Sequence, residues 1–413
     1  MQQVYIGPSH SMSWHGFDDE TTFESLITGK SPLKGIQNVI EEAQKNNVPG
    51  RIPWDLFKEF EIANKCVKNG PVEARYAYIC TRMLLDRFPQ VLDHRKDMGL
   101  YVGTMNNYYG LVGLRNGYRV CVNDQFTYDK RTFESKIGVG FSFVHPMVPV
   151  YKIPNNCVAN IALDWELRGA NANYFGEDSS STAIHESYLK VRSGRLKQTL
   201  TVTSNHLFLN YLDFLFTDLP TLTKKEPAKL IPEKDNFFFP SEWASSYLLC
   251  TKEQSEKLEV DRQAKILASH QTSFQGVYMR RNLKQETVMQ VVNTCLKKAK
   301  LKFSDLDLVV FDNVDKDKSQ IGALVSLREG GKTRLLTPSL FLGHPICANG
   351  GAMITTALLC LKHQKVFSSY LDGLPDEPEL TAQEENLELN RVLVLSQGLN
   401  NSLHGLILEK VNG

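Results

Sequence analysis

The side chains best suited to acid–base chemistry are two carboxylates and one imidazole. Glu177 and Asp178 stand at the start of a predicted helix over residues 178–192, and His344 precedes a glycine-rich stretch at 349–351. An imidazole exchanges a proton near neutral pH, and a carboxylate assists when the two groups meet. In the simpler structural interpretation, Glu177 compensates the dipole at a helix N-terminus and His344 is a hydrogen-bonded core residue.

The thiols are weaker candidates for chemistry. The eight cysteines stand at positions 66, 80, 121, 157, 250, 295, 347 and 360. None belongs to a C-x-x-C pair, and several lie in apolar runs, which is typical of reduced, buried thiols in a cytoplasmic protein. We interpret Cys157 and Cys347 as core thiols, because neither precedes a capped helix with a nearby base. His10, Trp14 and His15 lack metal-ligand spacing, so we expect no metal.

Composition narrows the class of protein. The chain has 413 residues, with 47 basic against 46 acidic side chains, so no long-range field would attract nucleic acid or an anionic membrane. No signal peptide or membrane-spanning stretch is evident, and we expect a cytoplasmic protein. The length suffices for two cores. The pairs Lys224–Lys225 and Lys297–Lys298 are interpreted as solvated faces that could also contact an acidic carrier protein.

Strand-like and helix-like segments alternate along the first half, which predicts a layered α/β architecture. Apolar residues at helical spacing predict a helix over 72–88, followed by a buried strand at 99–103. The cap-type residues 178–181 open the helix that carries Ile184 and Val191 on one face and stops at Gly194. A strand at 199–203 follows.

The second half repeats this pattern. A helical stripe over 288–299 precedes a strand at 306–311, and the segment 352–361 is apolar nearly all round, which predicts a fully buried helix. Strands at 392–395 and 405–408 flank a predicted turn at 396–401. Residues 219–240 are rich in Pro, Lys and Glu and are interpreted as a surface excursion.

Several segments, in order, resemble the ketosynthases, the condensing enzymes of the thiolase-like superfamily. They are Val4–Gly7 with TTFESLITGKSPL at 21–33, residues 153–156 through Leu167-Arg-Gly-Ala-Asn171, Ala183-Ile184 with Val191–Arg195, Gly343-His-Pro345 with Asn349–Ala352, and Gln397–Ser402. The resemblance implies a thiolase-like layered αβαβα fold built from two similar halves. We place the N-terminal half at 1–245 and the C-terminal half at 246–413.

The sequence departs from this family at its catalytic positions. The resemblance implies a cysteine nucleophile at the start of the helix over 178–192, and an ungapped match places Glu177 there, or Asp178 if the match shifts. The first family histidine is replaced by Asn313 or Asp312, and a lysine five residues before the second histidine by Ser339. Only His344 is retained, so no catalytic set is intact.

This pattern is similar to the chain-length factors of bacterial type II polyketide synthases. The resemblance implies a non-catalytic subunit that pairs with an active ketosynthase through a strand at 171–175 or 199–203 and limits the length of a poly-β-keto chain by cavity volume. It implies no cofactor of its own, because an acyl carrier protein would present phosphopantetheine to the partner subunit. An aromatic product is favoured over an aryl polyene.

Two alternatives remain open at the level of sequence. In the first, Glu177 and His344 decarboxylate a malonyl carrier, although a buried carboxylate disfavours a second carboxylate beside it. In the second, the chain is a degenerate ketosynthase that binds acyl chains or carriers as a homodimeric scaffold. A fold-level resemblance does not transfer a substrate, so the product stays undefined.

Overall fold

The computed structural model describes most of the chain. The described residues are 1–28, 52, 60, 62–68, 70–105, 153, 155–206, 241–274, 283–312, 318–328, 331–369, 384–398 and 400–411. The excursion predicted at 219–240, with Lys224–Lys225, lies outside them.

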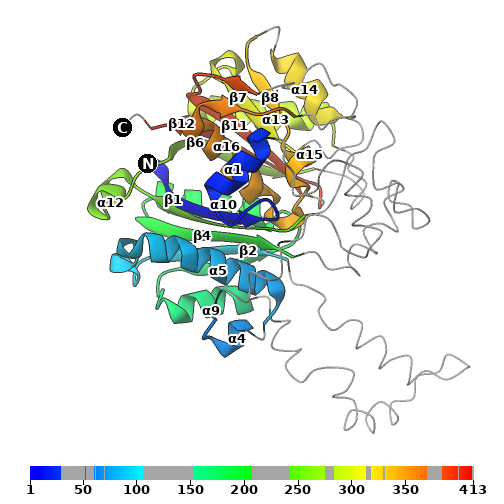
Figure 1. Ribbon diagram of the computed structural model, residues 1–413. Helices are drawn as coiled ribbons and strands as arrows, with labels where there is room; N and C mark the ends of the chain where they lie inside the picture. Colours follow the sequence, from blue (N-terminus) through cyan, green and yellow to red (C-terminus); the bar gives the residue numbers. More distant parts are fainter. Residues whose placement is uncertain are drawn as a thin grey trace, which may run out of the picture.

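One mixed sheet organises these residues (Figure 1). It contains β1 (Val4–Ser13), β2 (Gly99–Thr104), β3 (Asn171–Phe175), β4 (Gln198–Asn205), β5 (Trp243–Cys250), β6 (Ala264–Ser273), β7 (Leu308–Phe311), β8 (Arg334–Leu336), β11 (Arg391–Gly398) and β12 (Ser402–Lys410). Their spatial order is β3-β2-β4-β5-β1-β6-β12-β11-β7-β8. A separate short pair joins β9 (Lys365–Val366) to β10 (Glu385–Asn386).

The strand order reads the same from both ends, because the two halves repeat one topology. In the first half β2 pairs in parallel with β3 and β4, and antiparallel pairs continue through β5 to β1. In the second half β7 pairs in parallel with β8 and β11, and antiparallel pairs continue through β12 to β6. The antiparallel pair β1–β6 joins the halves. The predicted boundary at 245/246 falls within β5, and the division into domains stays a prediction.

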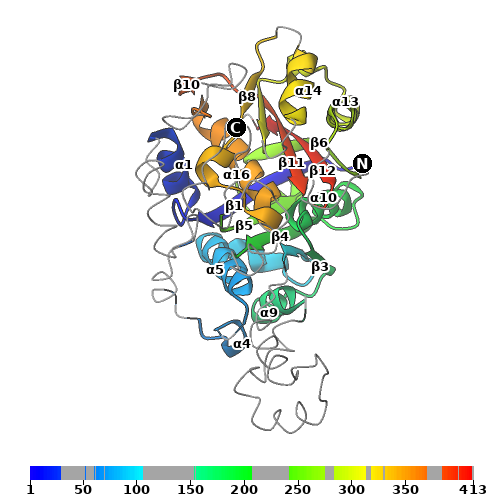
Figure 2. The ribbon, with the colours of Figure 1, turned by 90° about the vertical axis from the view of Figure 1, so that its right-hand side faces the viewer.

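Helices complete a layered arrangement. The longer ones are α1 (Asp19–Thr28), α5 (Val72–Arg87), α9 (Asn156–Asp164), α10 (Ser179–Arg192), α13 (Gln285–Ala299), α14 (Ser319–Arg328) and α16 (Asn349–His363). Short turns are α4 (Lys65–Lys68), η1 (Pro89–His94), α12 (Lys252–Lys257), η3 (Phe303–Asp305), α15 (Ser339–Leu342) and η4 (Ile346–Ala348). Helices α5 and α9 pack on the first half-sheet, α13 packs on the second and contacts α14, and α10 contacts α16 between the half-sheets (Figures 1 and 2).

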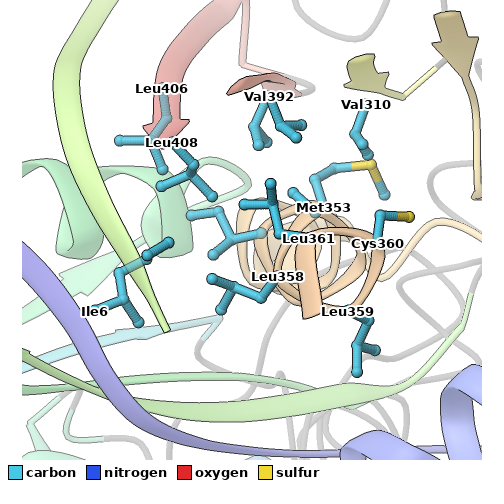
Figure 3. Close-up of a cluster of buried hydrophobic side chains, with 14 of the residues drawn as sticks. Ile6, Val310, Met353, Leu358, Leu359, Cys360, Leu361, Val392, Leu406 and Leu408 are labelled. Carbon is cyan, nitrogen blue, oxygen red and sulfur yellow. The ribbon is translucent and has the colours of Figure 1, made fainter. Parts of the chain in front are cut away.

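The central helix α16 is buried on every side, as its all-round apolar sequence predicts. Figure 3 shows Met353, Leu358 and Leu361 of α16 among side chains from the surrounding strands, including Ile6 and Val392. A buried aliphatic side chain of this size contributes about 1.5–3 kcal/mol relative to an exposed one. The main core therefore lies between the two halves, where α10 and α16 meet.

Most of the predicted elements are confirmed, with one clear error. The structure contains the predicted helices at α5, α10, α13 and α16 and the predicted strands at β2, β4 and β7. The turn predicted at 396–401 begins too early, because Ser396, Gln397 and Gly398 continue β11 and pair with β12 as far as Gly398–Ser402. Asn400 and Asn401 do lie in a turn. Buried hydrogen-bonding side chains replace apolar ones at this end of the hairpin, which hid the strand in the sequence.

Candidate functional site

The candidate site lies where the carboxyl ends of parallel strands from both halves meet. Open α/β sheets place their ligands at such strand ends. Glycines permit the close approach: a Cβ on Gly350 would lie 2.4 Å from Ser181 Oγ, and one on Gly398 would lie 2.7 Å from Asp178 Cβ. The backbone N–H of Gly350 donates to Ser180 Oγ at 3.0 Å. The N-termini of α10 and α16 therefore touch at the site.

The start of α10, where the resemblance implies a nucleophile, carries carboxylates. Glu177 is buried, with 8% of its surface exposed, and follows Gly176, whose φ is +120°. Asp178 is the N-cap residue, but its side chain forms no capping hydrogen bond. Its Oδ2 instead accepts a hydrogen bond of 2.9 Å from Gln271 Nε2 of β6. The expected capping role is therefore not performed by Asp178, whose carboxylate ties α10 to the second half.

Asp312 follows β7 directly and is fully buried. Its Oδ1 accepts from Gln320 Nε2 at 2.9 Å, and its Oδ2 accepts from the backbone N–H of Gln397 at 2.7 Å and from Asn349 Nδ2. Of the two residues predicted to replace the first family histidine, Asp312 lies in the site, and Asn313 lies outside the described residues. Asn349 belongs to the segment 349–352, one of those that resemble the ketosynthases, so the sequence drew attention to it. No feature of the sequence marked Gln320.

His344, predicted from the sequence as the one histidine kept from the ketosynthase pattern, lies beside this carboxylate. His344 is buried, and its Nε2 lies 3.9 Å from Asp312 Oδ2, beyond hydrogen-bonding distance. Trp14 Nε1 donates to the carbonyl of Leu342 at 2.9 Å and so holds the short helix α15, which precedes His344 in the chain. Ser339, which the sequence resemblance places at the position of a lysine, is also buried. The site therefore combines one imidazole with acids and small polar groups.

The thiols near the site are protonated core residues, as expected for Cys347 and Cys157. Burial raises the pKa of Cys347 well above its usual value, and the carboxylates of Glu73 and Glu177 raise it further. The Sγ atom donates to the backbone carbonyl of Ser204 at 3.3 Å. Burial likewise raises the pKa of Cys157. A thiol that stays protonated is a poor nucleophile, so neither Cys347 nor Cys157 is suited to that role.

One cysteine differs from the prediction of burial. All seven described cysteines are free thiols, and six are buried, but Cys66 is exposed on the short helix α4. Its neighbours Lys65 and Lys68 share a single polar turn, which gave no apolar context for burial. Cys121 lies outside the described residues.

A polar network that the sequence analysis missed crosses the layer beside α10. Ser269 Oγ lies 2.7 Å from His185 Nδ1 and 2.8 Å from His404 Nε2, so its single hydroxyl links two imidazoles. Burial lowers the pKa of His185 to about 4 and lowers the pKa of His404 well below its usual value. Both rings are therefore neutral at pH 7. Two features of the sequence could have indicated this network: the polar residues of β6, and His404 among the leucine and isoleucine residues of β12.

A second missed cluster lies at the ends of β4 and β5. Glu242 is buried, and its carboxylate accepts a hydrogen bond from Tyr76 Oη at 2.6 Å and lies 2.6 Å from His206 Nδ1. The backbone N–H of Ile52 donates to the same carboxylate at 2.8 Å. These contacts join α5 to the sheet next to the site.

The position of each strand in the sheet distinguishes the two segments predicted to pair with a partner subunit, 171–175 and 199–203. β4 is hydrogen-bonded to β2 on one side and to β5 on the other, so the interface predicted at 199–203 is wrong. β3 ends the sheet in the described part of the chain and carries Phe175, which is 54% exposed. No described strand pairs with the outer edge of segment 171–175, so in this part of the structure the edge is open to another strand.

Two other properties concern the described residues alone. No group of three or more His, Cys, Asp or Glu side chains among them is arranged to hold a metal ion, and this includes His10 and His15. None of their helices is long and apolar enough to cross a bilayer. The exposed pair Lys297–Lys298 lies in the last turn of α13, and Lys298 Nζ donates to the carbonyl of Ser269 at 3.1 Å.

Comparisons with known proteins agree with this geometry at the level of fold. No protein-family model matches the sequence, and no curated protein sequence matches it. Among solved structures, the ishigamide ketosynthase/chain length factor is similar with a TM-score of 0.79 and 14% identity, and a β-ketoacyl synthase from Burkholderia phymatum STM815 with a TM-score of 0.77 and 15% identity. In both cases all of each chain is covered.

A third solved structure holds a type II PKS acyl-carrier protein in complex with its ketosynthase bound to the hexaketide. It is similar with a TM-score of 0.74 and 12% identity over the whole of both chains. The chain therefore has the thiolase-like fold of the ketosynthases. At these identities the likeness establishes the fold, and the role of the chain follows from its own site.

Proposed function

We propose that this chain is the non-catalytic, chain-length-factor-like subunit of a ketosynthase heterodimer. The observation that carries the proposal is the start of α10, where the sequence resemblance implies a nucleophile and the chain has Glu177 and the N-cap residue Asp178. A carboxylate cannot hold an acyl group as a transferable thioester. The partner would supply the cysteine and histidines and receive phosphopantetheine from an acyl carrier protein.

The surroundings of His344 support a role without catalysis. The buried carboxylate of Asp312 lies 3.9 Å from its imidazole and would repel a second carboxylate brought into the same place. Decarboxylation of a malonyl group by Glu177 and His344 is therefore disfavoured. In our proposal, this subunit shapes the cavity in which a poly-β-keto chain grows. An aromatic product is favoured.

The open edge of β3 supports the pairing. Asn171 and Phe175 at the two ends of β3 are exposed, and the three residues between them are half-buried. Tyr174 stacks on Tyr101 of β2 with ring centroids 6.5 Å apart. A strand from a partner would extend the sheet and cover Phe175. Stable partners of this kind bury roughly 1,200–2,000 Å² or more in total.

The test is co-expression with a ketosynthase of the same genome that has an intact cysteine and two histidines. Sizing and malonyl-carrier elongation are measured for each subunit alone and for both together. We expect a one-to-one complex, elongation only with both subunits, and no effect of Glu177→Ala on the elongation rate. Turnover of malonyl carrier by this chain alone, lost in Glu177→Ala or His344→Ala, would show an enzyme. A homodimer that does not bind the ketosynthase would support the alternative in which the chain is a scaffold.

A further inference from the structure

Three donors from three elements converge on the carboxylate of Asp312. They are Gln320 Nε2 from α14, Asn349 Nδ2 from α16 and the backbone N–H of Gln397 in β11. Gln320 is fixed in turn, because its Nε2 also lies 2.7 Å from the backbone carbonyl of Asp312 and 3.2 Å from Gln397 Oε1. The donors are thus held by the fold rather than by the side chain that they bind.

The pocket is built for a carboxylate. Asp312 is fully buried, and removing a carboxylate from water is costly unless several hydrogen bonds compensate. Hydrogen bonds to an ionised acceptor are about twice as strong as neutral ones. Asn349 Nδ2 also lies 3.0 Å from Ser396 Oγ, which fixes the orientation of its amide. The same donors would bind the carboxylate of a separate molecule if the side chain of Asp312 were absent.

We propose that the pocket around Asp312 is a carboxylate-binding site that the chain fills with its own side chain. The ligand class is a small carboxylate, either free or at the end of an acyl group. The biological role of this site rests on the proposed function: because the side chain of Asp312 occupies the site, a malonyl-type carboxylate cannot bind there beside His344. The subunit then remains a wall of the cavity.

The experiment removes the plug and supplies a free carboxylate. Asp312→Gly removes the carboxylate that the three donors share. Thermal unfolding is then followed during titration with sodium formate, acetate or malonate against sodium chloride at equal ionic strength. Formate should raise the unfolding temperature of Asp312→Gly saturably and recover at least half of the loss. The wild-type chain should respond equally to formate and chloride.

Asp307→Gly is the matched control. Asp307 Oδ2 also accepts two hydrogen bonds, from the backbone N–H groups of Asn390 at 2.7 Å and Arg391 at 2.8 Å, but it is half-buried and open to water. Its removal should therefore not create a response specific to formate. Asp312→Ser, which leaves a smaller space, should respond to formate more than to acetate.

The outcomes separate this inference from the proposed function. No saturable formate response in either Asp312 variant, or an equal response in Asp307→Gly, overturns the carboxylate site even if the chain still pairs with a ketosynthase. Failure of both Asp312 variants to fold in the presence of formate also overturns it. A formate response in a chain that forms no complex establishes the site and refutes the pairing.

Discussion

Lowering the pH from 7 to 5 should destabilise this protein through His15. The ring is buried; its Nε2 lies 2.6 Å from the carbonyl of Phe341 and its Nδ1 lies 2.8 Å from Ser25 Oγ. Burial lowers the pKa of His15 to about 4, and the hydrogen bond to Phe341 opposes this only in part. The folded chain thus keeps His15 neutral where the unfolded chain, with a pKa of about 6.5, binds a proton.

The sign and size follow from this difference in proton binding. Stability is full above the unfolded pKa, falls as the pH drops below about 6.5, and stops falling below about 4. With these two pKa values, His15 alone costs about 2 kcal/mol of unfolding free energy between pH 7 and pH 5.

The assay is urea unfolding of the wild type and His15→Gln at both pH values. His15→Gln should be less stable at pH 7, but the gap between the two proteins should shrink by about 2 kcal/mol at pH 5. Taking the difference between proteins removes the contributions of other buried histidines. A gap that stays constant between the two pH values would refute the assignment of a neutral, desolvated His15.

Three further predictions concern the edge strand, the helix contact and the thiols. Phe175→Asp should abolish co-elution with a ketosynthase partner in sizing, whereas Leu163→Asp, at a side chain 74% exposed on α9, should not. Gly350→Ala should lower the unfolding free energy by about 1–3 kcal/mol, measured in urea, because its new Cβ would overlap the start of α10. Cys66→Ser should remove one thiol that reacts rapidly with a disulfide reagent in the native state, and Cys157→Ser should remove none.

The sequence predicted the central elements well because their hydrophobic periodicity reflects burial directly. The apolar run that becomes α16 has no polar face, and the stripe carrying Val288, Val291 and Val292 is one buried face of α13. Such patterns depend on local spacing alone. The motifs that resemble ketosynthases added the arrangement of the two halves.

The site was less predictable because its contacts join residues far apart in the chain. The sequence marked Glu177 and His344, but left Asp312 and Asn313 as alternatives for the same place. Gln320 of α14 contacts Asp312, which follows β7, only when the chain is folded, and no local sequence pattern reports that contact. The error over 199–203 has the same origin, since whether a strand is internal depends on which strands flank it.

The mirrored strand order also limits how far an assembly could grow. In the described part of the chain the sheet ends at β3 on one side and at β8 on the other. β8 has only three residues, and Arg334 at its start pairs with Glu385, so this end offers little edge to another strand. Among the described strands, pairing through β3 would leave the two β8 ends exposed, and the resulting sheet would terminate at two subunits instead of extending into a filament.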